Sequence, residues 1–325
     1  MKKITLLLAI CAFVLTTQAK VWRVNNNATM NANFTSFVAA QSTVSANDTL
    51  YFEGSTVSYG DIIVTKPLTV IGPGYFLNEN PQTQSTAISA KFGKVIYNSG
   101  STGSVITGVN IQSSMTISES NISVIKCLLN GTITLNSSLS SIVSIFIFSN
   151  YMTTGITSSG SNSISSVLIC NNHISNKDCC NSIVFDTNVS GEIKNNILDW
   201  NIDVSNFKMS NNIVSGSVSR NNNTFYNNIG KGTQFPTGNY NQQNVIMTDV
   251  FVGATGNSTD GQWQLKEYSP ALGAGNDGTD CGMFGGSSPY VLSGLPSIPA
   301  IYEITMPATG DNINGIDVTI KAKTH

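Results

Sequence analysis

Three aspartates and one lysine in the middle of the chain carry the side chains best suited to acid–base chemistry. Asp186, Asp199 and Asp203 stand near the ends of short β-type runs, and Lys194 lies between the first two. Carboxylates and amines that converge on one face can exchange protons with a bound substrate. The surrounding sequence is poor in charge, so we expect these four residues to be solvated positions scattered over the surface. They are weak catalytic candidates, and no active-site groove is predicted from them.

A tryptophan and a histidine in the same region are the next candidates. Trp200 lies between Asp199 and Asn201, where an exposed indole would form a stacking platform for a sugar ring. We keep it as a weak ligand-stacking candidate. His173 directly follows Asn172. Its place beside a turn predicts an exposed histidine rather than a catalytic base.

An oxygen-rich stretch near the C-terminus is the best candidate for a metal site. Residues 276–280 read Asn-Asp-Gly-Thr-Asp and supply the carboxylate, amide and hydroxyl oxygens that Ca²⁺ prefers. The stretch lacks the alternating carboxylates and the terminal glutamate of an EF-hand loop, so a plain turn is the expected structure. Asp277 and Asp280 are weak calcium candidates, and no cofactor is predicted.

Five cysteines follow the N-terminal segment, and an odd number cannot pair completely within one chain. Two of them are adjacent in the sequence, which disfavours a bond between those two. No CxxC pair is present and histidines are scarce, so a zinc site is not expected. We expect small buried apolar residues with at most one disulfide, whose pairing stays open among Cys127, Cys170, Cys179, Cys180 and Cys281.

Residues 1–19 have the pattern of a cleaved export signal. The chain begins Met-Lys-Lys, continues with an apolar run over residues 4–15, and offers a Thr-Gln-Ala cleavage site at residues 17–19. The run is too short to cross a bilayer, and no later segment reaches 18 apolar residues. The sequence therefore predicts a secreted protein, extracellular or on the outer cell surface, that does not span the membrane.

The charge content excludes several classes of partner. The chain has 325 residues, of which only 10% are charged, and 16 Lys and Arg face 18 Asp and Glu. Such a chain lacks the basic footprint of a nucleic-acid-binding protein and of a polybasic membrane-surface protein. Ser, Thr, Gly and Asn take the place of charged residues. We expect cell-surface proteins or glycans as partners.

A repeat organises the middle of the chain. Five segments share an apolar residue followed three positions later by asparagine, at intervals of 22, 24, 16 and 16 residues. The asparagines are Asn150, Asn172, Asn196, Asn212 and Asn228. An earlier member fits the same frame with Leu128 at the asparagine position. Repeats of about 20 residues, each too small to bury its own apolar face, indicate a stacked solenoid.

The asparagine column has a physical cause. A coil of short strands turns sharply, often through a left-handed backbone conformation that Asn tolerates well. Each carboxamide both donates and accepts hydrogen bonds, so amides stacked at the strand spacing of about 4.8 Å can bond to one another along the stack. We therefore predict that the five asparagines form one structural ladder.

The fold expected is an all-β, single-stranded right-handed parallel β-helix with an asparagine ladder. Right-handed crossovers dominate parallel connections, and the repeat is too short for intervening helices. Residues 33–40 predict a short helical cap on the first coil, as solenoids need capped ends. The domains expected are a signal peptide (1–19), a β-helix (20–290) and a C-terminal β-hairpin tail (291–325). The tail would cover the bottom edge of the helix or act as a sorting or docking segment, with docking to another surface protein.

Several of these segments resemble secreted right-handed parallel β-helix proteins of the pectin-lyase-like superfamily. The resemblance rests on the coils with paired asparagines and on residues 47–52 (Asn-Asp-Thr-Leu-Tyr-Phe) and 66–72 (Lys-Pro-Leu-Thr-Val-Ile-Gly). Residues 269–275 and 280–286 are similar to the closing coil of many such proteins from Bacteroidota. The resemblance covers about residues 21–290 and is specific for architecture.

The activity that the resemblance implies is polysaccharide cleavage, by a lyase or by a hydrolase. Lyases of this superfamily use an acidic calcium cluster with a Lys or Arg base, and its hydrolases use grouped aspartates. No charged string of this chain matches those motifs, so no catalytic role is carried over. We therefore expect a non-enzymatic binding or structural protein of the cell surface, adhesin-like or an accessory subunit of a surface assembly. A polysaccharide lyase or glycoside hydrolase is the alternative.

Overall fold

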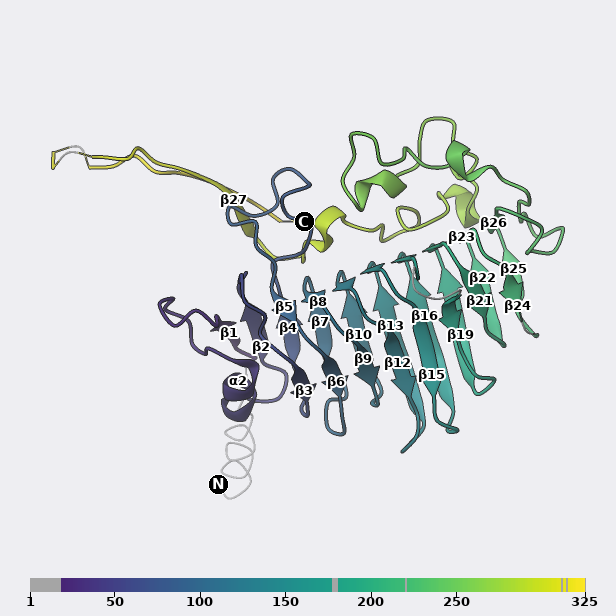
Figure 1. Ribbon diagram of the computed structural model, residues 1–325, viewed down its shortest axis with the longest axis horizontal. Helices are drawn as coiled ribbons and strands as arrows, with labels where there is room; N and C mark the ends of the chain where they lie inside the picture. The colour runs from purple at the N-terminus through teal and green to yellow at the C-terminus, as the bar shows by residue number, and fades with distance from the viewer. Residues whose placement is uncertain (1–18, 177–180, 220, 311, 314, 325) are drawn as a thin grey trace, which may run out of the picture.

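The computed structural model describes residues 19–176, 181–219, 221–310, 312–313 and 315–324. In this part of the chain, short strands stack into three parallel sheets that run the length of the molecule (Figure 1). After the first two coils, each coil supplies one strand to sheet A, one to sheet C and one to sheet B, in that order, and the last coil ends in sheet C. The chain is a right-handed parallel β-helix, as the repeat predicts.

Ten described strands form sheet A: β1 (Val21–Val24), β2 (Thr49–Phe52), β4 (Thr69–Ile71), β7 (Val105–Thr107), β10 (Ile122–Ile125), β13 (Ile142–Phe148), β16 (Ile164–Cys170), β19 (Val189–Lys194), β22 (Phe207–Ser210) and β25 (Thr224–Tyr226). Sheet B consists of β3 (Ile62–Val64), β6 (Val95–Tyr97), β9 (Met115–Ile117), β12 (Ile133–Asn136), β15 (Ile156–Ser159), β18 (Asn181–Val184), β21 (Asn201–Asp203) and β24 (Val218–Ser219). Sheet C consists of β5 (Lys91–Phe92), β8 (Asn110–Ile111), β11 (Leu128–Leu129), β14 (Tyr151–Met152), β17 (His173–Ile174), β20 (Ile197–Leu198), β23 (Ile213–Val214) and β26 (Ile229–Gly230).

The core lies inside the coils because side chains alternate between the two faces of each strand. In sheet A, the parallel register stacks Val124, Ile147, Ile169, Ile193 and Met209 above one another, and all five are buried. Stacking equivalent aliphatic residues from coil to coil removes each of them from water on every side. Apolar burial contributes about 25 cal/mol per Å², so this column is a major source of stability.

The predicted ladder is present and runs along the turns between sheets A and C. The side-chain amide of Asn150 donates to Oδ1 of Asn172 at 2.9 Å, and the same bond joins each later pair down to Asn228. Asn228 then donates to Asn241, a further member that the spacing does not predict. At the other end, Asn150 accepts the backbone N–H of Cys127. Cys127 therefore occupies the ladder position, and the expectation of Leu128 there is wrong by one residue.

A helix closes the first coil, close to its expected place. The helix α2 (Phe37–Thr43) begins after Ser36, whose hydroxyl accepts the backbone N–H of Ala39 as an N-cap. Phe37 and Ala40 face the coil interior and are buried there. None of the helices in the described part of the chain has the length and hydropathy of a bilayer-spanning segment.

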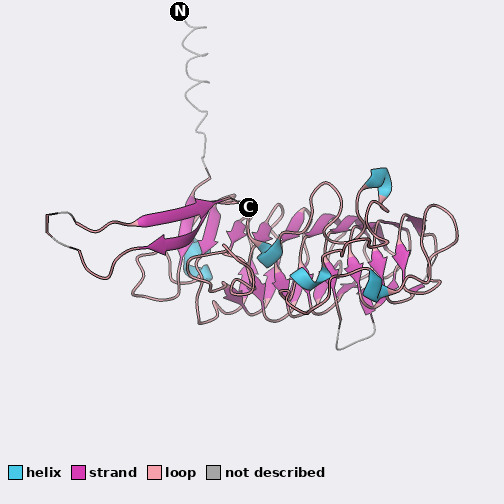
Figure 2. Cartoon of the chain, turned by 90° about the horizontal axis from the view of Figure 1, so that it is seen from above, coloured by secondary structure: helices cyan, strands magenta, loops and turns pink. Residues whose placement is uncertain are grey.

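The coils end at Gly230, earlier than the boundary predicted near residue 290. Residues 231–299, here called the return segment, run back along the outer face of sheet C toward the first coils (Figure 1). The return segment contains the 3₁₀ turns η1 (Met247–Asp249), η2 (Gly261–Trp263), η3 (Asn276–Gly278) and η4 (Leu292–Gly294). Seen from above, short helical turns are spread along the coil stack (Figure 2).

The return segment covers apolar residues that point outward from sheet C. Leu128, Tyr151, Ile197, Ile213 and Ile229 form this outward column with His173, and all of them are buried. They pack against a second set of core residues from the return segment: Val250, Ala271, Cys281, Met283 and Tyr290. The residues that resemble a closing coil, 269–275 and 280–286, therefore belong to this cover and not to a last coil.

A second set of asparagines holds the return segment in place. Each residue just before a ladder asparagine, from Asn171 to Asn227, has a positive φ near 55° and points its amide outward. Asn171 donates to the carbonyls of Met283 and Gly285, and Asn227 donates to that of Ala274. Asn211 accepts the N–H of Asn276. Each pair of asparagines thus uses one amide inside the stack and one outside it.

The chain ends in an antiparallel hairpin of β27 (Ala300–Thr305) and β28 (Thr319–Lys323). Its base contacts the loop after β4, where the N–H of Ser85 donates to Ile301 and Lys323 lies 3.3 Å from the Gln82 side chain. The hairpin lies beside the first coils, at the opposite end from β26 (Figure 1). The expectation that it covers the bottom edge of the helix is therefore wrong, because the return segment carries the chain back before the hairpin forms.

Candidate functional site

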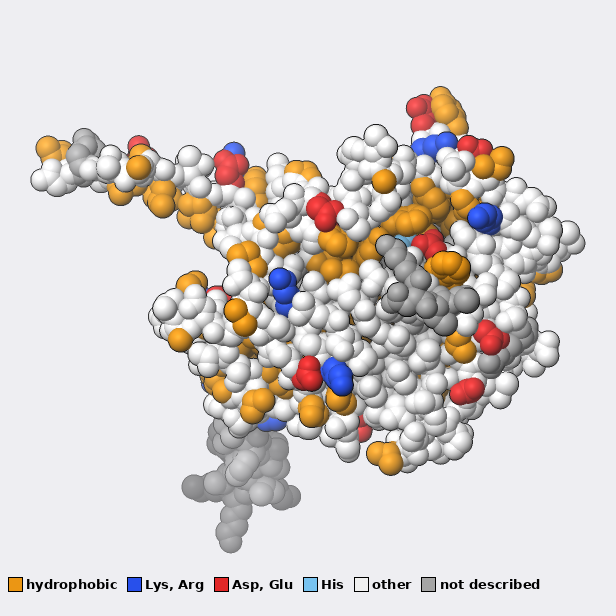
Figure 3. Space-filling model, in the orientation of Figure 1, with side chains coloured by type: hydrophobic (Ala, Val, Ile, Leu, Met, Phe, Trp, Pro, Cys, Tyr) orange, Lys and Arg blue, Asp and Glu red, His pale blue; other side chains and the backbone are white. Residues whose placement is uncertain are grey.

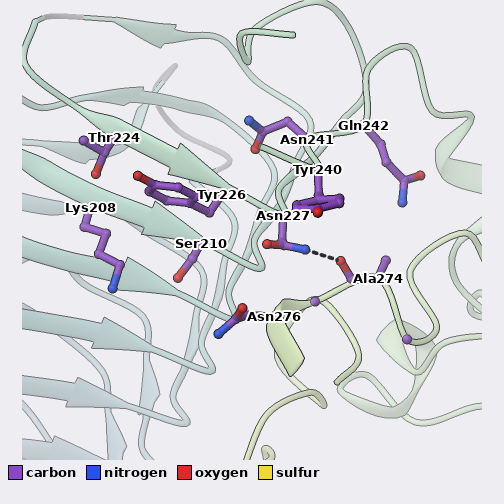
Figure 4. Close-up of a pocket in the computed structure, with 12 residues that line it drawn as sticks. Lys208, Ser210, Thr224, Tyr226, Asn227, Tyr240, Asn241, Gln242, Ala274 and Asn276 are labelled. Carbon is purple, nitrogen blue, oxygen red and sulfur yellow. Dashed lines mark hydrogen bonds between the residues drawn. The ribbon is translucent and has the colours of Figure 1, made fainter. Parts of the chain in front are cut away.

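A large cavity lies over the last coils of sheet A. It has a volume of about 1010 Å³ and is bounded by β22, β25, the loop after β26 and the return segment (Figure 4). We call it the tyrosine groove; the residues that line it are Lys208, Ser210, Thr224, Tyr226, Asn227, Tyr240, Asn241, Gln242, Gly273, Ala274, Gly275 and Asn276. The volume lies at the upper end of the range for ligand sites, about 300–1,000 Å³.

Two tyrosines supply the aromatic surface of the groove. Tyr226 projects outward from β25 and is 42% exposed, and Tyr240 stands on the loop after β26 and is 83% exposed. In Figure 4 they approach the groove from different elements, the strand and the loop. An exposed tyrosine offers an apolar ring face and a polar hydroxyl at low entropic cost. Such rings suit a ligand that has both apolar and hydroxyl surfaces.

Polar groups with free hydrogen-bonding capacity surround the rings. In the described part of the chain, the hydroxyls of Ser210, Thr224 and Tyr226 make no hydrogen bond to protein atoms. Lys208 supplies a positive charge and lies 3.8 Å from the Glu192 carboxylate on the neighbouring coil. The groove therefore presents hydroxyls, a cation and aromatic surface to solvent.

The walls are rigid because both asparagine columns end there. Asn241 accepts from Asn228 and donates to the carbonyls of Phe225 and Gly238, which fixes the loop that carries Tyr240. On the opposite wall, the amide of Asn227 donates to the carbonyl of Ala274 at 3.0 Å, the bond drawn in Figure 4. The groove is thus preformed by buried and half-buried hydrogen bonds.

The four acid–base candidates are divided among the three sheets, and two of them, Asp186 and Asp203, lie near the ends of the neighbouring strands β18 and β21. Lys194 ends β19 in sheet A, Asp203 ends β21 in sheet B, and Asp199 directly follows β20 in sheet C. Asp186 follows β18 and is exposed, with its carboxylate accepting from the hydroxyl of Ser158. Asp203 accepts from the Ser219 hydroxyl at 2.9 Å. Asp199 pairs with His173 instead of with any of these groups.

Trp200 does not line the tyrosine groove, whereas Asp280 bonds to Gly273 of its lining and Asp277 follows the lining residue Asn276. Trp200 is partly exposed between β20 and β21, and its backbone N–H donates to the Ser182 hydroxyl. Asp280 is committed locally, because its carboxylate accepts the N–H of Gly273 at 2.8 Å. The side chain of Asp277 lies outside the described residues. Among described residues, no group of three His, Cys, Asp or Glu side chains is placed to hold a metal ion.

His173 is buried, so the expectation of an exposed histidine is wrong. It lies on β17 in the outward column of sheet C, which the return segment covers, and it is 1% exposed. Its ring stacks between Tyr151 at 4.6 Å and Trp263 at 4.2 Å, measured between ring centroids. The sequence around His173 contains no sign of this burial, because the cover comes from residues about 90 positions later.

The three described cysteines are free and buried, which agrees with their interpretation as small apolar residues. Burial raises the pKa of Cys127 to about 12, that of Cys170 to about 11 and that of Cys281 to about 12. Thiols with such pKa values are poor nucleophiles at neutral pH. Cys179 and Cys180, like residues 1–18 of the expected signal, lie outside the described residues.

Comparison with known proteins gives one structural neighbour to report. The chain matches no protein-family profile and no curated protein sequence. The crystal structure of pectate lyase Pel9A is similar with a TM-score of 0.45 and 11% identity, over 82% of this chain and 96% of that chain. The three parallel sheets of this chain form a parallel β-helix.

Proposed function

We propose that the chain is a secreted, non-enzymatic protein that binds glycans of its surroundings in the tyrosine groove. The observation that carries the proposal is the pair of exposed rings, Tyr226 and Tyr240, set in a preformed groove with free hydroxyls. A sugar ring has an apolar face that packs on an aromatic ring and a rim of hydroxyls that needs hydrogen-bonding partners. Both requirements are met by side chains of the described lining.

The length of the groove also suits a chain of sugars rather than a compact ligand. Its lining runs from Lys208 on β22 across Thr224 on β25 to Tyr240 beyond the last coil. Adjacent strands are about 4.8 Å apart, so a lining that crosses β22, β25 and the loop beyond them extends over about two strand spacings, or roughly 10 Å. An extended oligosaccharide would contact successive coils, with Tyr226 and Tyr240 as its two stacking positions.

The test is a binding screen of the purified protein against immobilised neutral and acidic oligosaccharides, followed by calorimetry on those retained. We expect Tyr226→Ala and Tyr240→Ala each to raise the dissociation constant at least tenfold, which corresponds to about 1.4 kcal/mol. Tyr268→Ala is the matched control. Tyr268 is also strongly exposed (87%), has a φ of 64° against 60° for Tyr240, and lies outside the groove lining.

Two outcomes would contradict the proposal. Retention of no glycan, or equal losses in Tyr240→Ala and Tyr268→Ala, would remove the groove as the binding site. The screen also covers the alternative of a polysaccharide lyase or hydrolase. Unsaturated products that absorb in the ultraviolet, or new reducing ends, would show an enzyme, and their loss in Asp199→Ala or Asp203→Ala would locate its chemistry.

A further inference from the structure

A second cavity lies between sheet C and the return segment. Its volume is about 330 Å³, and we call it the tryptophan cavity. The residues that line it are Asp199, Ser215, Met247, Thr248, Phe251, Gly253, Gln262 and Trp263. Figure 3 shows apolar side chains gathered in the hollow below the return segment, with acidic atoms among them. This volume is at the lower end of the range for ligand sites, which fits a small molecule.

The walls of this cavity are aromatic and apolar. Trp263 ends η2, and Phe251 meets it edge to face with a centroid distance of 5.2 Å and an angle of 82°. The two rings are fixed to each other by the backbone, because Phe251 and Leu265 form an antiparallel bridge. Met247 adds a thioether from η1. Faces of tryptophan and phenylalanine attract cations through the ring quadrupole.

Asp199 provides a carboxylate that the protein uses only in part. Its side chain is 21% exposed, and its Oδ2 lies 3.2 Å from Nε2 of His173. Among described residues, no other side chain or backbone group bonds to this carboxylate. An ionised carboxylate has about four acceptor positions, so most of its capacity is available to a ligand in the cavity.

The carboxylate is held in a fixed position. The backbone N–H of Asp199 donates to the carbonyl of Ile174, which is the residue after His173 on β17. His173 itself is clamped between Tyr151 and Trp263. Lys266 of the return segment is already paired, because it donates to the carbonyl of Thr248 and lies 3.5 Å from the Asp249 carboxylate. Asp199 is therefore the charged member of the cavity lining, and its sign is negative.

We infer that the tryptophan cavity binds a small organic cation, an ammonium group carried on an apolar body. The positive head would pair with Asp199 and lie against the rings of Trp263 and Phe251, while the body would pack on Met247. A carboxylate beside aromatic rings is the arrangement that recognises quaternary and primary ammonium groups. The site is separate from the tyrosine groove and does not depend on glycan binding.

Calorimetry on the purified full chain tests this inference with choline and its neutral isostere 3,3-dimethylbutan-1-ol, which differ in charge and hardly in shape. We expect choline to bind at least tenfold more tightly than the isostere. Asp199→Asn should abolish this difference. Asp249→Asn, which removes a carboxylate next to the cavity but outside its lining, should preserve it. Circular dichroism of each variant checks that the fold is intact.

Several outcomes would overturn the inference. Equal binding of the two probes would show an apolar cavity without cation recognition, and a lack of choline binding at millimolar concentration would show no site. Tighter binding of glucose than of choline to the Tyr226→Ala variant, which lacks a stacking ring of the tyrosine groove, would assign the cavity to a sugar. The comparison of the two probes uses the unmodified protein, so it stands even where Asp199→Asn fails to fold. Tyr226→Ala should lose glycan and keep choline, which separates this inference from the proposed function.

Discussion

The inner and the outer asparagine columns occupy neighbouring positions in the same sequence pairs but join different parts of the molecule. Asn172 and Asn196 are fully buried, and their amides connect one coil to the next. Asn171 and Asn227 each lie one residue before a ladder asparagine and have a left-handed backbone conformation. Their amides connect the coils to the return segment. The difference teaches that one dipeptide can hold both a repeating core and its non-repeating cover.

The two columns should therefore fail in different ways. Loss of an inner amide leaves buried polar groups without partners inside the stack, where no water replaces them. Loss of an outer amide frees a segment whose carbonyls can turn toward solvent. Inner substitutions should lower the stability of the coils, and outer substitutions should release the return segment before the coils unfold.

The largest effect is expected at a buried carboxylate that anchors the return segment. Asp260 is fully buried and accepts hydrogen bonds from the Tyr290 hydroxyl, the Ser293 N–H, the Asn80 amide and the Ser258 hydroxyl. Asp260→Leu removes all four bonds and leaves the donors of Tyr290 and Ser293 buried. We expect a loss of about 3–5 kcal/mol in the free energy of unfolding, measured by urea denaturation. A loss below about 1 kcal/mol would show that the outer asparagines alone hold the segment.

An inner ladder substitution should come next in size. Asn196 accepts from the amide of Asn172 and donates to Asn212, and its amide also bonds the carbonyls of Ile169 and Lys194. Asn196→Leu should cost about 1–3 kcal/mol in the free energy of unfolding, because these partners stay buried. Urea denaturation followed by circular dichroism measures the loss. An unchanged midpoint would mean that aliphatic stacking compensates for the broken ladder.

An outer substitution should have a smaller and more local effect. Asn171→Gly keeps the left-handed backbone, which glycine adopts freely, and removes the bonds to Met283 and Gly285. We expect about 1 kcal/mol of global destabilisation. The sharper measurement is alkylation at pH 8: Cys281 in the return segment should be labelled faster than in the unmodified protein, while Cys127 in the coils keeps its rate.

The cysteine comparison works because both thiols begin from the same state. Burial raises the pKa of Cys281 and of Cys127 to about 12, so neither is expected to react in the closed protein. Selective labelling of Cys281 requires local opening of the return segment. Equal acceleration at both thiols would show instead that cover and coils open as one cooperative unit.

The sequence predicts the coils better than the cover, for a physical reason. The asparagines at positions 150, 172 and 196 recur because each coil packs against a neighbour with an equivalent asparagine. This repetition is visible in the sequence without knowledge of the fold. The return segment packs against a different coil at every step, so it has no period. The sequence could not indicate that Trp263 covers His173, because that contact depends on where the coils end.

The sequence does not indicate the tyrosine groove, for the same reason. Tyr226 lies within the repeat, but a single tyrosine is not a distinctive signal of a binding site. The position of Tyr240 is set by its neighbour Asn241, which extends the ladder by one member. The interval from Asn228 is 13 residues, shorter than any interval in the repeat. As the sixth ladder residue, Asn241 places the loop that carries Tyr240 beside the last coil.

The smallest effect is expected at the hairpin, which belongs to neither column. Beyond Tyr302, the hairpin lies away from the coils and its base contacts residues 82 and 85 (Figure 1). The exposed pair of Glu303 and Lys321, at 2.9 Å, joins the two strands only to each other.

Ending the chain after Tyr302 keeps the bond between Ser85 and Ile301. It should leave the urea midpoint and Cys281 labelling unchanged, because an exposed two-stranded hairpin adds little to a fold it hardly touches. A lower midpoint, or faster labelling of Cys281, would show that the hairpin braces the return segment and that the cover is held at its end as well as by its asparagines.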